Sequence, residues 1–530
     1  MGIYLNPGNE AFQISVNDDI YVDKSELISF TNNRVGKRKR FICVSRPRRF
    51  GKSMAAEMLS AYYDKSCDSG KLFQNLDISK DMTFDKHLNQ YNVIFLNIQQ
   101  FLRKAGSALN LTHYMEDKVL DELKKEYAGI ISNTESSLPD ALTQIYKWDM
   151  LPERGFVFII DEWDCIFREA KNNVEAQRQY LDFLRDLFKD RVYVKLAYMT
   201  GILPIKKYGT HSALNIFDEF SMTAPGRLAK YVGFTESEVR DLCEKHNMSF
   251  IDAQKWYDGY RFVHAKHIYN PKSIVDAMTE ECYRSFWTGT ETYEALQIYI
   301  DLDVDGLKQS VVSMLAGGAC LVDTGSFQND MTSFKSKDDI LTLLVHLGYL
   351  AFDEENSSVF IPNEEVRNEF IRAVKNGNHK ELVKAIQASD ELIAATIRMD
   401  GDAVARMIEE VHSANTAPIF YNNEQALRTV ILLAYISRMD DYCTIQELPT
   451  GNGYADIVFL PYKYSDKPAM IVELKWDKDA EGAITQIKKN NYIEAIKNYG
   501  GDILLVGINY DKNTKKHTCI IEKCVTIQQN

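Results

Sequence analysis

Short apolar runs alternate with helix-like segments from about residue 21 to residue 209. Four of the runs are almost continuously apolar, as strands buried on both faces are. These predicted strands are Phe41–Ser45, Val93–Ile98, Phe156–Ile160 and Val192–Thr200. The helices predicted between them are Met54–Lys65, Leu109–Tyr127, Leu138–Met150 and Ala176–Lys189. This order predicts an α/β domain whose parallel sheet is covered by helices on both faces.

Helical, aromatic-rich segments follow between Thr235 and Leu302 and predict a helical lid. The predicted lid helices are Glu236–Asn247, Asp252–Asp258, Lys272–Tyr283 and Thr292–Ile300. Further on, a helical pattern over Asp338–Leu350 leads through a polar turn into Val359-Phe-Ile-Pro. A helix followed by a two-stranded wing fits that order and predicts a winged-helix-like module. A generic α+β adaptor fits the same pattern.

The last part of the chain mixes helices and strands. A helical connector is predicted over Lys375–Glu410, and a long helix over Asn423–Met439. Three strands and one helix are then predicted at Asp456–Leu460, Ala469–Lys475, Ala480–Tyr499 (the helix) and Ile503–Asn509. A chain of 530 residues is too long for one hydrophobic core, so several domains are expected.

Composition narrows the class of protein. Hydrophobic residues make up 45% of the chain and charged residues 26%, as in an ordinary soluble protein, and no apolar run is long enough to span a bilayer. The nine cysteines are scattered without a C-x-x-C pair, which favours reduced thiols over a disulfide framework or a zinc site. The N-terminus lacks an export signal. We therefore expect a cytoplasmic protein without a membrane partner.

The most informative motif is Arg46-Pro-Arg48-Arg49-Phe50-Gly51-Lys52-Ser53, between the first predicted strand and helix. A loop at this place offers backbone N–H groups and a positive helix end to nucleotide phosphates. Lys52 would neutralise phosphate oxygens and Ser53 would hold Mg²⁺. In the pattern G-x-x-x-x-G-K-[ST], however, the first glycine falls on Arg46. Pro47 restricts the backbone further, because the residue before a proline favours an extended conformation.

Two arginines in the same loop can compensate for the missing glycine. Arg48 and Arg49 add positive charge beside the phosphates, and with Phe50 and Gly51 they complete the predicted nucleotide-binding loop. The same loop could serve nucleotide binding rather than fast turnover.

A second strand end supplies the acidic partner that a phosphate loop needs. Phe156–Ile160 runs directly into Asp161 and Glu162, which places both carboxylates at the carboxyl edge of the sheet. Asp161 would join the Mg²⁺ shell, and Glu162 would polarise the attacking water. Thr200, at the end of the next strand, would sit between these residues and the γ-phosphate. A buried strand that ends in a solvated acidic turn is the alternative.

A second group of carboxylates lies near the C-terminus. Asp456 is on one predicted strand, while Glu473 and Lys475 share one face of the next because side chains alternate along a strand. Asp456 and Glu473 can share a Mg²⁺ that activates water, and Lys475 would orient or deprotonate that water. Glu447 and Glu424 could enlarge the metal site. An ordinary hairpin with surface charges is the alternative.

Net charge argues against a protein that coats nucleic acid. The whole chain carries −13, and residues 441–530 hold eleven Lys against twelve Asp and Glu, a net of −1. This charge balance offers little net attraction for a phosphate backbone. A local basic face on the helix with Lys478, Lys488, Lys489 and Lys497 remains compatible with DNA contact.

Taken in order, these motifs resemble the AAA-ATPase-like proteins with a C-terminal PD-(D/E)XK nuclease-like domain, a group common in anaerobic bacteria. The matching segments also include Tyr21-Val-Asp23-Lys24-Ser25, Ile160-Asp-Glu-Trp-Asp164, Thr200-Gly-Ile202, Gly233-Phe-Thr-Glu236, Trp256–Phe262, Tyr269-Asn-Pro271 and Asn363-Glu-Glu-Val-Arg367. The resemblance implies that arginine is usual at position 46 and that Gln486 takes the polar helix position of such nucleases. For the aromatic segment Trp256–Phe262, domain packing is expected, and a ligand cage is the alternative.

The expected architecture is α/β and multidomain. It comprises a P-loop ATPase domain (1–215), a helical lid (216–304), a winged-helix-like and helical connector (305–415) and a PD-(D/E)XK nuclease-like domain (416–530). The expected function is ATP binding and hydrolysis coupled to Mg²⁺-dependent cleavage of DNA. Two alternatives stay open: a nucleotide-switched regulatory protein whose nuclease fold only binds nucleic acid, and a protein that acts on a protein partner. A homo-oligomer is also compatible with the sequence.

Overall fold

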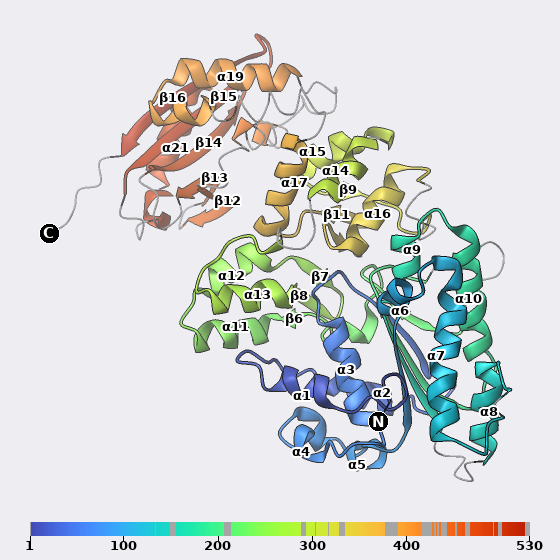
Figure 1. Cartoon of the computed structure of the whole chain (residues 1–530). Helices are drawn as coiled ribbons and strands as arrows, with labels where there is room; N and C mark the ends of the chain where they lie inside the picture. The colour runs from blue at the N-terminus through green and yellow to red at the C-terminus, as the bar shows by residue number, and fades with distance from the viewer. Residues whose placement is uncertain are drawn as a thin grey trace. The chain divides into compact units, whose positions relative to one another are not determined.

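The chain divides into two compact units in the computed structural model. The first comprises Met1–Gly289 and Leu321–Val366, and the second Thr290–Cys320 and Arg367–Asn530 (Figure 1). The structure describes residues 2–132, 134–148, 155–205, 214–287, 293–302, 304–315, 317–327, 334–376, 389, 391–414, 427–428, 431, 434–435, 442–450, 453–461, 467–490, 492–496 and 501–524. Each unit is described by itself.

A five-stranded parallel sheet forms the centre of the first unit. Its strands are β1 (Phe41–Ser45), β2 (Asn92–Asn97), β3 (Phe156–Asp161), β4 (Val194–Gly201) and β5 (Asp218–Phe220), in the order β2-β3-β4-β1-β5. The continuously apolar strands β1 and β3 are buried over their whole length, as predicted for a sheet covered on both faces. Because the strands are parallel, their carboxyl ends all lie at the same edge of the sheet.

Helices cover both faces of this sheet. The helix after the phosphate loop, α3, packs on β2, β3 and β4, while α7, α8 and α10 lie together on the other side (Figure 1). The helices up to the end of the sheet are α1 (Glu10–Val16), α2 (Glu26–Asn32), α3 (Lys52–Tyr63), α4 (Gly70–Phe73), α5 (Phe84–His87), α6 (Ile98–Lys104), α7 (Leu111–Glu126), α8 (Leu138–Trp148), α9 (Cys165–Glu169) and α10 (Val174–Phe188), with 3₁₀ turns at Asp77–Lys80 and Ala108–Asn110.

The predicted lid contains a small sheet as well as helices. Its helices are α11 (Glu236–Lys245), α12 (Phe250–Tyr257) and α13 (Pro271–Thr279), preceded by a 3₁₀ turn at Gly226–Leu228, and its strands are β6 (Phe234–Thr235), β7 (Tyr260–Phe262) and β8 (Ala265–Tyr269), in the order β6-β8-β7. The helical prediction missed these strands because each is short. Asn270 caps α13, and Pro271 occupies its first turn, where a missing N–H costs nothing.

Lys24 ties the N-terminal segment to the lid. Its ammonium donates to both carboxylate oxygens of Glu238, at 2.7 and 2.6 Å, and to the carbonyl of Lys230. Glu238 in turn closes the capping box of α11 with Thr235. Two segments of the family resemblance, around Lys24 and around Glu236, therefore meet in one ion pair.

Helix α16 (Lys337–Leu347) and the hairpin of β10 (Ala351–Asp353) and β11 (Ser358–Phe360) form the helix-plus-hairpin predicted from the sequence. The short strand β9 (Cys320–Leu321) joins the hairpin in the order β10-β11-β9. A capping box at Ser336 begins α16, and Gly348, with φ 88°, ends it in a left-handed cap. The chain also forms the helices α14 (Tyr293–Leu302), α15 (Leu307–Leu315) and α17 (Glu364–Asn376), with a 3₁₀ turn at Val304–Gly306.

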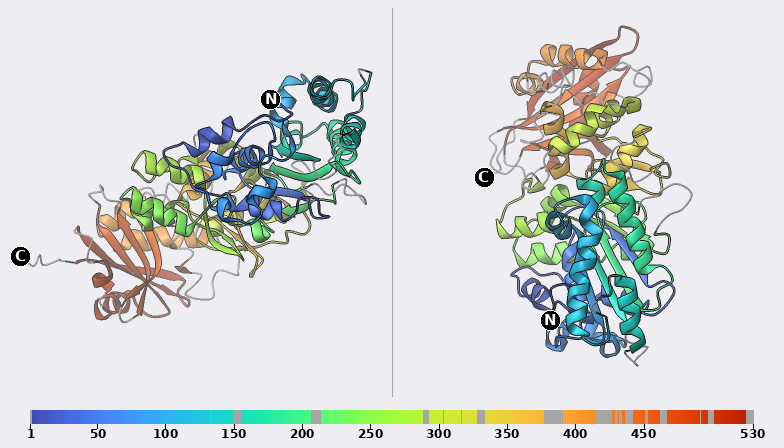
Figure 2. Two further views of the ribbon diagram at one scale, coloured as in Figure 1. Left: turned by 90° about the horizontal axis from the view of Figure 1, so that it is seen from below. Right: turned by 45° about the vertical axis from the view of Figure 1, so that its right-hand side comes forward.

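The second unit contains a mixed five-stranded sheet, shown from two further directions in Figure 2, in orange and red. Its strands are β12 (Tyr442–Thr450), β13 (Gly453–Pro461), β14 (Ala469–Trp476), β15 (Ile503–Asp511) and β16 (Lys516–Cys524), in sequential order, and only β14 and β15 run parallel. Its helices are α19 (Gly401–Ala414) and α21 (Ala480–Lys489), with a 3₁₀ turn at Tyr492–Ile496.

Alternation along the strands creates two cores, one on each face of this sheet. Val472 and Leu474 pack with Val404 and Ile408 of α19. Ile471 belongs to the other core, with Ile484 and Ile487 of α21. Glu473 and Lys475 share the parity of Ile471, so the sheet directs them to the face that α21 covers.

Some predictions need correction or fall outside the description. The helix was predicted over Ala480–Tyr499, but α21 ends at Lys489. A 3₁₀ turn over Tyr492–Ile496 follows it. Strands β5, β12 and β16 were not predicted. Most of the predicted helix Asn423–Met439 lies outside the described residues. In the described part of the chain, no helix is long and apolar enough to cross a bilayer, and the cysteines are free thiols.

Candidate functional site

The loop between β1 and α3 folds as a tight phosphate-loop-like turn. Gly51 has φ 84° and Arg49 has φ 68°, both in the left-handed region. No atom lies within 4 Å of a Cβ built on Gly51, so glycine is needed there for its backbone conformation and not for space. Helix α3 begins at Lys52, and its first N–H groups face the loop without helical partners.

Arg46 stands where the glycine of the usual pattern would be, and its side chain is fully buried. Its Nη1 donates to the carbonyls of Ser45, at 2.9 Å, and Phe220, at 3.0 Å. The guanidinium also lies over the ring of Phe262, and burial lowers its pKa to about 10. The Arg46 side chain therefore points into the protein, where its hydrogen bond to Phe220 links the loop to β5. It does not point towards the side of the loop where phosphates would bind.

Lys52 is buried at the start of α3. Its Nζ donates to the carbonyl of Pro47 at 2.8 Å, which closes the loop on itself. Burial lowers the pKa of Lys52, while the nearby carboxylates of Glu162 and Asp161 oppose that change. The ammonium is thus placed inside the loop and beside the acidic strand end.

Asp161, at the end of β3, is the centre of a polar cluster. Its Oδ2 accepts from Ser53 Oγ at 2.8 Å and from Asn97 Nδ2 at 3.2 Å. Its Oδ1 accepts from Thr200 Oγ1 at 2.8 Å and from the N–H of Glu162 at 3.0 Å. Donors from α3, β2 and β4 therefore converge on one carboxylate at the carboxyl edge of the sheet.

Glu162 is engaged by an arginine that sequence reasoning missed. Its carboxylate pairs with Arg168 Nη2, and Arg168 Nε also donates to Asp164 Oδ2 at 3.0 Å. Burial raises the pKa of Glu162, and the positive charges of Lys52 and Arg168 act against this rise. Burial alone would lower the pKa of Arg168, but Asp164 and Glu162 hold it above its ordinary value. The spacing of Asp164 and Arg168, four residues apart, is the signal that could have revealed the pair.

Two further polar residues lie near Asp161. Asn97 ends β2 and also caps α6, so its place at the strand edge could have been predicted with that of Thr200. Glu57 lies one helical turn after Ser53 on α3. Burial raises the pKa of Glu57, and the charge of Asp161 adds to the rise.

The phosphate loop also contacts the lid and α16. The ring of Phe50 meets that of Tyr260 edge-on, with 5.3 Å between centroids, and Tyr260 Oη donates to the carbonyl of Gly348 at 2.6 Å. A Cβ on Gly259 would lie 2.1 Å from the carbonyl oxygen of Pro362, so that glycine allows two backbones to meet. The aromatic segment Trp256–Phe262 therefore packs modules against the loop, as the packing interpretation predicts.

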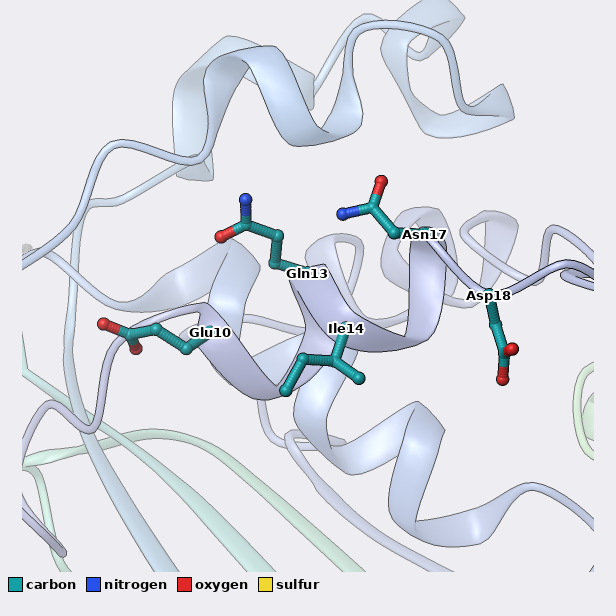
Figure 3. Close-up of a pocket in the computed structure, with 5 residues that line it drawn as sticks. All are labelled: Glu10, Gln13, Ile14, Asn17 and Asp18. Carbon is teal, nitrogen blue, oxygen red and sulfur yellow. The ribbon is translucent and has the colours of Figure 1, made fainter.

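The remaining predicted loop residues differ in exposure. Arg48 is exposed, while Arg49 is half-buried and its Nη1 lies 3.4 Å from the carbonyl of Phe286. Figure 3 shows a separate hollow over α1, lined by Glu10, Gln13, Ile14, Asn17 and Asp18. All five residues are exposed, and none belongs to the polar cluster around Asp161.

The second unit brings Asp456, Glu473 and Lys475 together. The register places Ile457 opposite Val472, so Asp456 and Glu473 follow as neighbours on β13 and β14. The N–H of Leu474 donates to Asp456 Oδ2 at 2.9 Å, and Lys475 Nζ donates to Glu473 Oε1 at 2.9 Å. All three side chains are nearly buried.

The electrostatics of this group follow from its burial. Burial raises the pKa of Glu473 to about 7, with the charge of Asp456 adding to the rise and Lys475 opposing it. Oε2 of Glu473 is buried and has no described hydrogen-bond partner. Two carboxylates with one unpartnered buried oxygen fit a hard cation such as Mg²⁺. Among the described residues, no three His, Cys, Asp or Glu side chains gather into a metal cluster.

The other predicted nuclease residues are placed less fully. Glu424 and the side chain of Glu447 lie outside the described residues. Gln486 Nε2, on α21, bonds to the hydroxyl of Tyr492 at 3.2 Å. Sequence reasoning missed Arg428, whose Nη2 pairs with Asp456 Oδ1 at 2.7 Å.

The fold and the two sites define a protein with a P-loop-ATPase-like sheet and a separate nuclease-like sheet. The family profile described as predicted AAA-ATPase matches residues 8–210, and that of the PD-(D/E)XK nuclease superfamily matches residues 422–519. The chain therefore carries a predicted AAA-ATPase domain followed by a C-terminal domain of the PD-(D/E)XK nuclease superfamily. The resemblance found in the sequence is confirmed.

Solved structures give distant similarities. A Walker-type ATPase of Pyrococcus abyssi is 10% identical, with 66% of this chain and 94% of that chain covered and a TM-score of 0.34. The ORC2 protein of Aeropyrum pernix is 10% identical, with 68% and 97% covered and a TM-score of 0.29. The ORC1 protein of the same organism, solved in complex with DNA, is 11% identical, with 71% and 97% covered and a TM-score of 0.25. No curated protein matches the chain.

Proposed function

We propose that the first unit binds and hydrolyses ATP with Mg²⁺, and that the second unit cleaves DNA with Mg²⁺ under control of that nucleotide. The observation that carries the proposal is the pairing of Ser53 Oγ with Asp161 Oδ2, 2.8 Å apart, beside a buried lysine. A hydroxyl at a helix start next to a strand-end carboxylate is the donor set that holds Mg²⁺ on a nucleotide.

The residues of the first site have separable tasks. Ser53 and Asp161 would hold the cation, Lys52 would neutralise phosphate oxygens, and the loop from Arg48 to Gly51 would surround the phosphates with N–H groups. Thr200 and Asn97 orient the Asp161 carboxylate through hydrogen bonds. Glu162 would polarise the attacking water, and for this task its carboxylate must leave Arg168.

The residues of the second site support phosphodiester hydrolysis. Asp456 and Glu473 would hold Mg²⁺, which supplies a hydroxide-like nucleophile and charge stabilisation when bound. Lys475 lies beside Glu473, where its ammonium can orient water and stabilise negative charge. Burial, which raises the pKa of Glu473, makes the charged carboxylate costly until a cation faces it.

Two variants test the proposal in the full-length protein. Lys52→Ala should lose ATP binding, measured with a fluorescent ATP analogue, and should lose any ATP effect on DNA cleavage. Asp456→Ala should bind ATP normally and lose Mg²⁺-dependent cleavage of single- and double-stranded DNA. Lys523→Ala is the control, because Lys523 forms an exposed pair with Asp502 in the same domain. Cleavage by Asp456→Ala at the parent rate would refute the nuclease assignment.

A different outcome would favour the regulatory alternative. Normal ATP binding together with retention of DNA, but no cleavage under any divalent cation, would mean that the nuclease fold only binds. The ion pair of Arg428 with Asp456 is the specific observation that favours this alternative, because it already neutralises one of the two carboxylates.

A further inference from the structure

Arg428 reaches the second site from outside the strands that carry the predicted nuclease residues. Its Nη2 lies 2.7 Å from Asp456 Oδ1, and the two side chains are 15% and 12% exposed. The other oxygen of Asp456 accepts from the N–H of Leu474. The two oxygens of Asp456 thus have different partners: the backbone of β14 donates to one, and the Arg428 side chain donates to the other.

Among the described residues of the site, two cationic side chains each pair with one acidic side chain. Arg428 and Lys475 bring two positive charges, and Asp456 and Glu473 bring two carboxylates. A divalent cation between the carboxylates would face both positive groups at short range and in a largely buried setting, where like charges repel strongly. One of the two positive side chains must therefore move before a cation can bind well.

Arg428 is the side chain whose position conflicts with a cation. It occupies Oδ1 of Asp456, whereas Lys475 donates to Oε1 of Glu473 and leaves Oε2 without a described partner. Lys475 stands two residues from Glu473 on the same strand, so β14 holds that pair together. Arg428 belongs to a different segment and contacts the site through its long side chain. Its planar guanidinium also matches the geometry of a phosphate group with two parallel hydrogen bonds, which an ammonium does not.

We propose that Arg428 occupies Asp456 while the site lacks a metal ion, yields that oxygen when a divalent cation binds, and then contacts the phosphodiester of the nucleic acid. The proposal rests on the proposed nuclease function of the second unit. It assigns Arg428 two successive partners: a carboxylate without the cation and a substrate phosphate with it. No covalent step is involved.

Manganese is the probe for the first half of the exchange. Free Mn²⁺ is followed by electron paramagnetic resonance while full-length parent, Arg428→Gln and Arg428→Lys proteins are titrated. Arg428→Gln should bind Mn²⁺ about tenfold tighter at the second site, because a neutral side chain no longer competes for Asp456. Arg428→Lys should stay near the parent value. Lys523→Gln removes an equal charge from an exposed pair with Asp502 and should not change Mn²⁺ affinity. Asp456→Ala identifies which Mn²⁺ signal belongs to this site.

The second half is measured with a phosphorothioate oligonucleotide at saturating Mn²⁺. Arg428→Gln should bind it about tenfold more weakly than the parent, whereas Lys523→Gln should bind it equally well. Circular dichroism of each variant establishes that it is folded, and Arg428→Lys provides a variant with the charge retained.

The results separate this inference from the function on which it rests. Parent protein that cleaves DNA with a metal ion, together with unchanged or weaker Mn²⁺ binding by Arg428→Gln, would overturn the exchange alone. Unchanged oligonucleotide binding by Arg428→Gln would overturn the phosphate contact. A parent that neither binds Mn²⁺ at Asp456 nor cleaves DNA would overturn both the exchange and the nuclease function.

Discussion

Gly348 leaves just enough room for the ring of Pro47. A Cβ built on Gly348 would lie 2.7 Å from the Cβ of Pro47 and 2.8 Å from its Cγ, closer than real Cβ atoms approach. Pro47 is in the phosphate loop, and Gly348 ends α16, so the loop touches a helix that lies far away in the sequence. A change in the path of the loop would therefore alter its contact with the end of α16.

Gly348→Ala should disturb the nucleotide loop from a distance. The new methyl group must displace Pro47, and the left-handed φ of 88° adds strain, so we expect ATP affinity to fall about tenfold. Gly129→Ala is a matched control, because Gly129 has φ 87° and no atom within 4 Å of a built Cβ. Titration with a fluorescent ATP analogue compares the two. Equal affinities in both variants would show that the contact does not matter for binding.

Arg46→Gly restores the usual glycine of a phosphate loop, yet it should destabilise this one. The change removes two hydrogen bonds to carbonyls and leaves a cavity under Phe262, which we expect to cost about 3 kcal/mol of unfolding free energy. Arg48→Gly adds the same backbone freedom at an exposed position of the same loop. Denaturant unfolding of both variants measures the difference. A gain in stability for Arg46→Gly would show that the buried guanidinium strains the loop.

Arg168→Gln should lower stability much more than a surface pair would. It leaves the buried carboxylates of Glu162 and Asp164 without their cation, which typically costs about 3 kcal/mol or more. Arg178→Gln, which breaks an exposed pair with Glu175, should change stability by less than about 0.5 kcal/mol. Calorimetric unfolding distinguishes the two variants, and similar small shifts would argue against the buried network.

His346 should make the first unit less stable in mild acid. Burial lowers its pKa to about 3, with the charge of Arg46 adding to the effect, whereas an unfolded histidine titrates near its ordinary value of 6.5. Between these values the unfolded chain binds a proton that the folded chain does not, so stability falls as pH falls. This single group contributes a slope of about 1.4 kcal/mol per pH unit in that range.

The variant His346→Gln has no such proton to bind and should show a shallower loss of stability between pH 6.5 and pH 4.5. His113→Gln, at an exposed position, should keep the parent slope. Unfolding midpoints in a pH series give both slopes. Identical slopes for His346→Gln and the parent would mean that His346 is protonated in the folded protein.

The central sheet could be predicted because strands that are buried on both faces require nearly continuous apolar residues. The runs that became β1 to β4 are almost continuously apolar, and their ends were placed within one or two residues. The strand β5 was missed because Asp218 and Glu219 give it a polar, edge-like sequence. Strand β16 alternates buried and exposed residues around lysines and was missed for a similar reason.

In the candidate sites, too, some contacts could be predicted from the sequence and others could not. Ser53, Asp161 and Thr200 could be predicted to meet because each stands at a helix start or strand end on one edge of a parallel sheet. Arg428 could not be predicted, since its pairing with Asp456 is a tertiary contact between residues 28 positions apart, which no local pattern reveals. The inward direction of Arg46 was also hidden, because the side chain's partners, such as Phe220, come from a strand that the sequence did not reveal.

The chain passes between its two units three times, after Gly289, Cys320 and Val366. A protease cut within Thr290–Cys320 would therefore leave a C-terminal fragment that still carries Leu321–Val366, a part of the first unit. That part would stay attached through contacts such as Glu365 with Ser273 and Gly348 with Tyr260. The two compact units are therefore interlaced along the sequence, so neither unit can be lost, gained or exchanged as one contiguous block, although the ATPase-like region 8–210 and the nuclease-like region 422–519 are each contiguous.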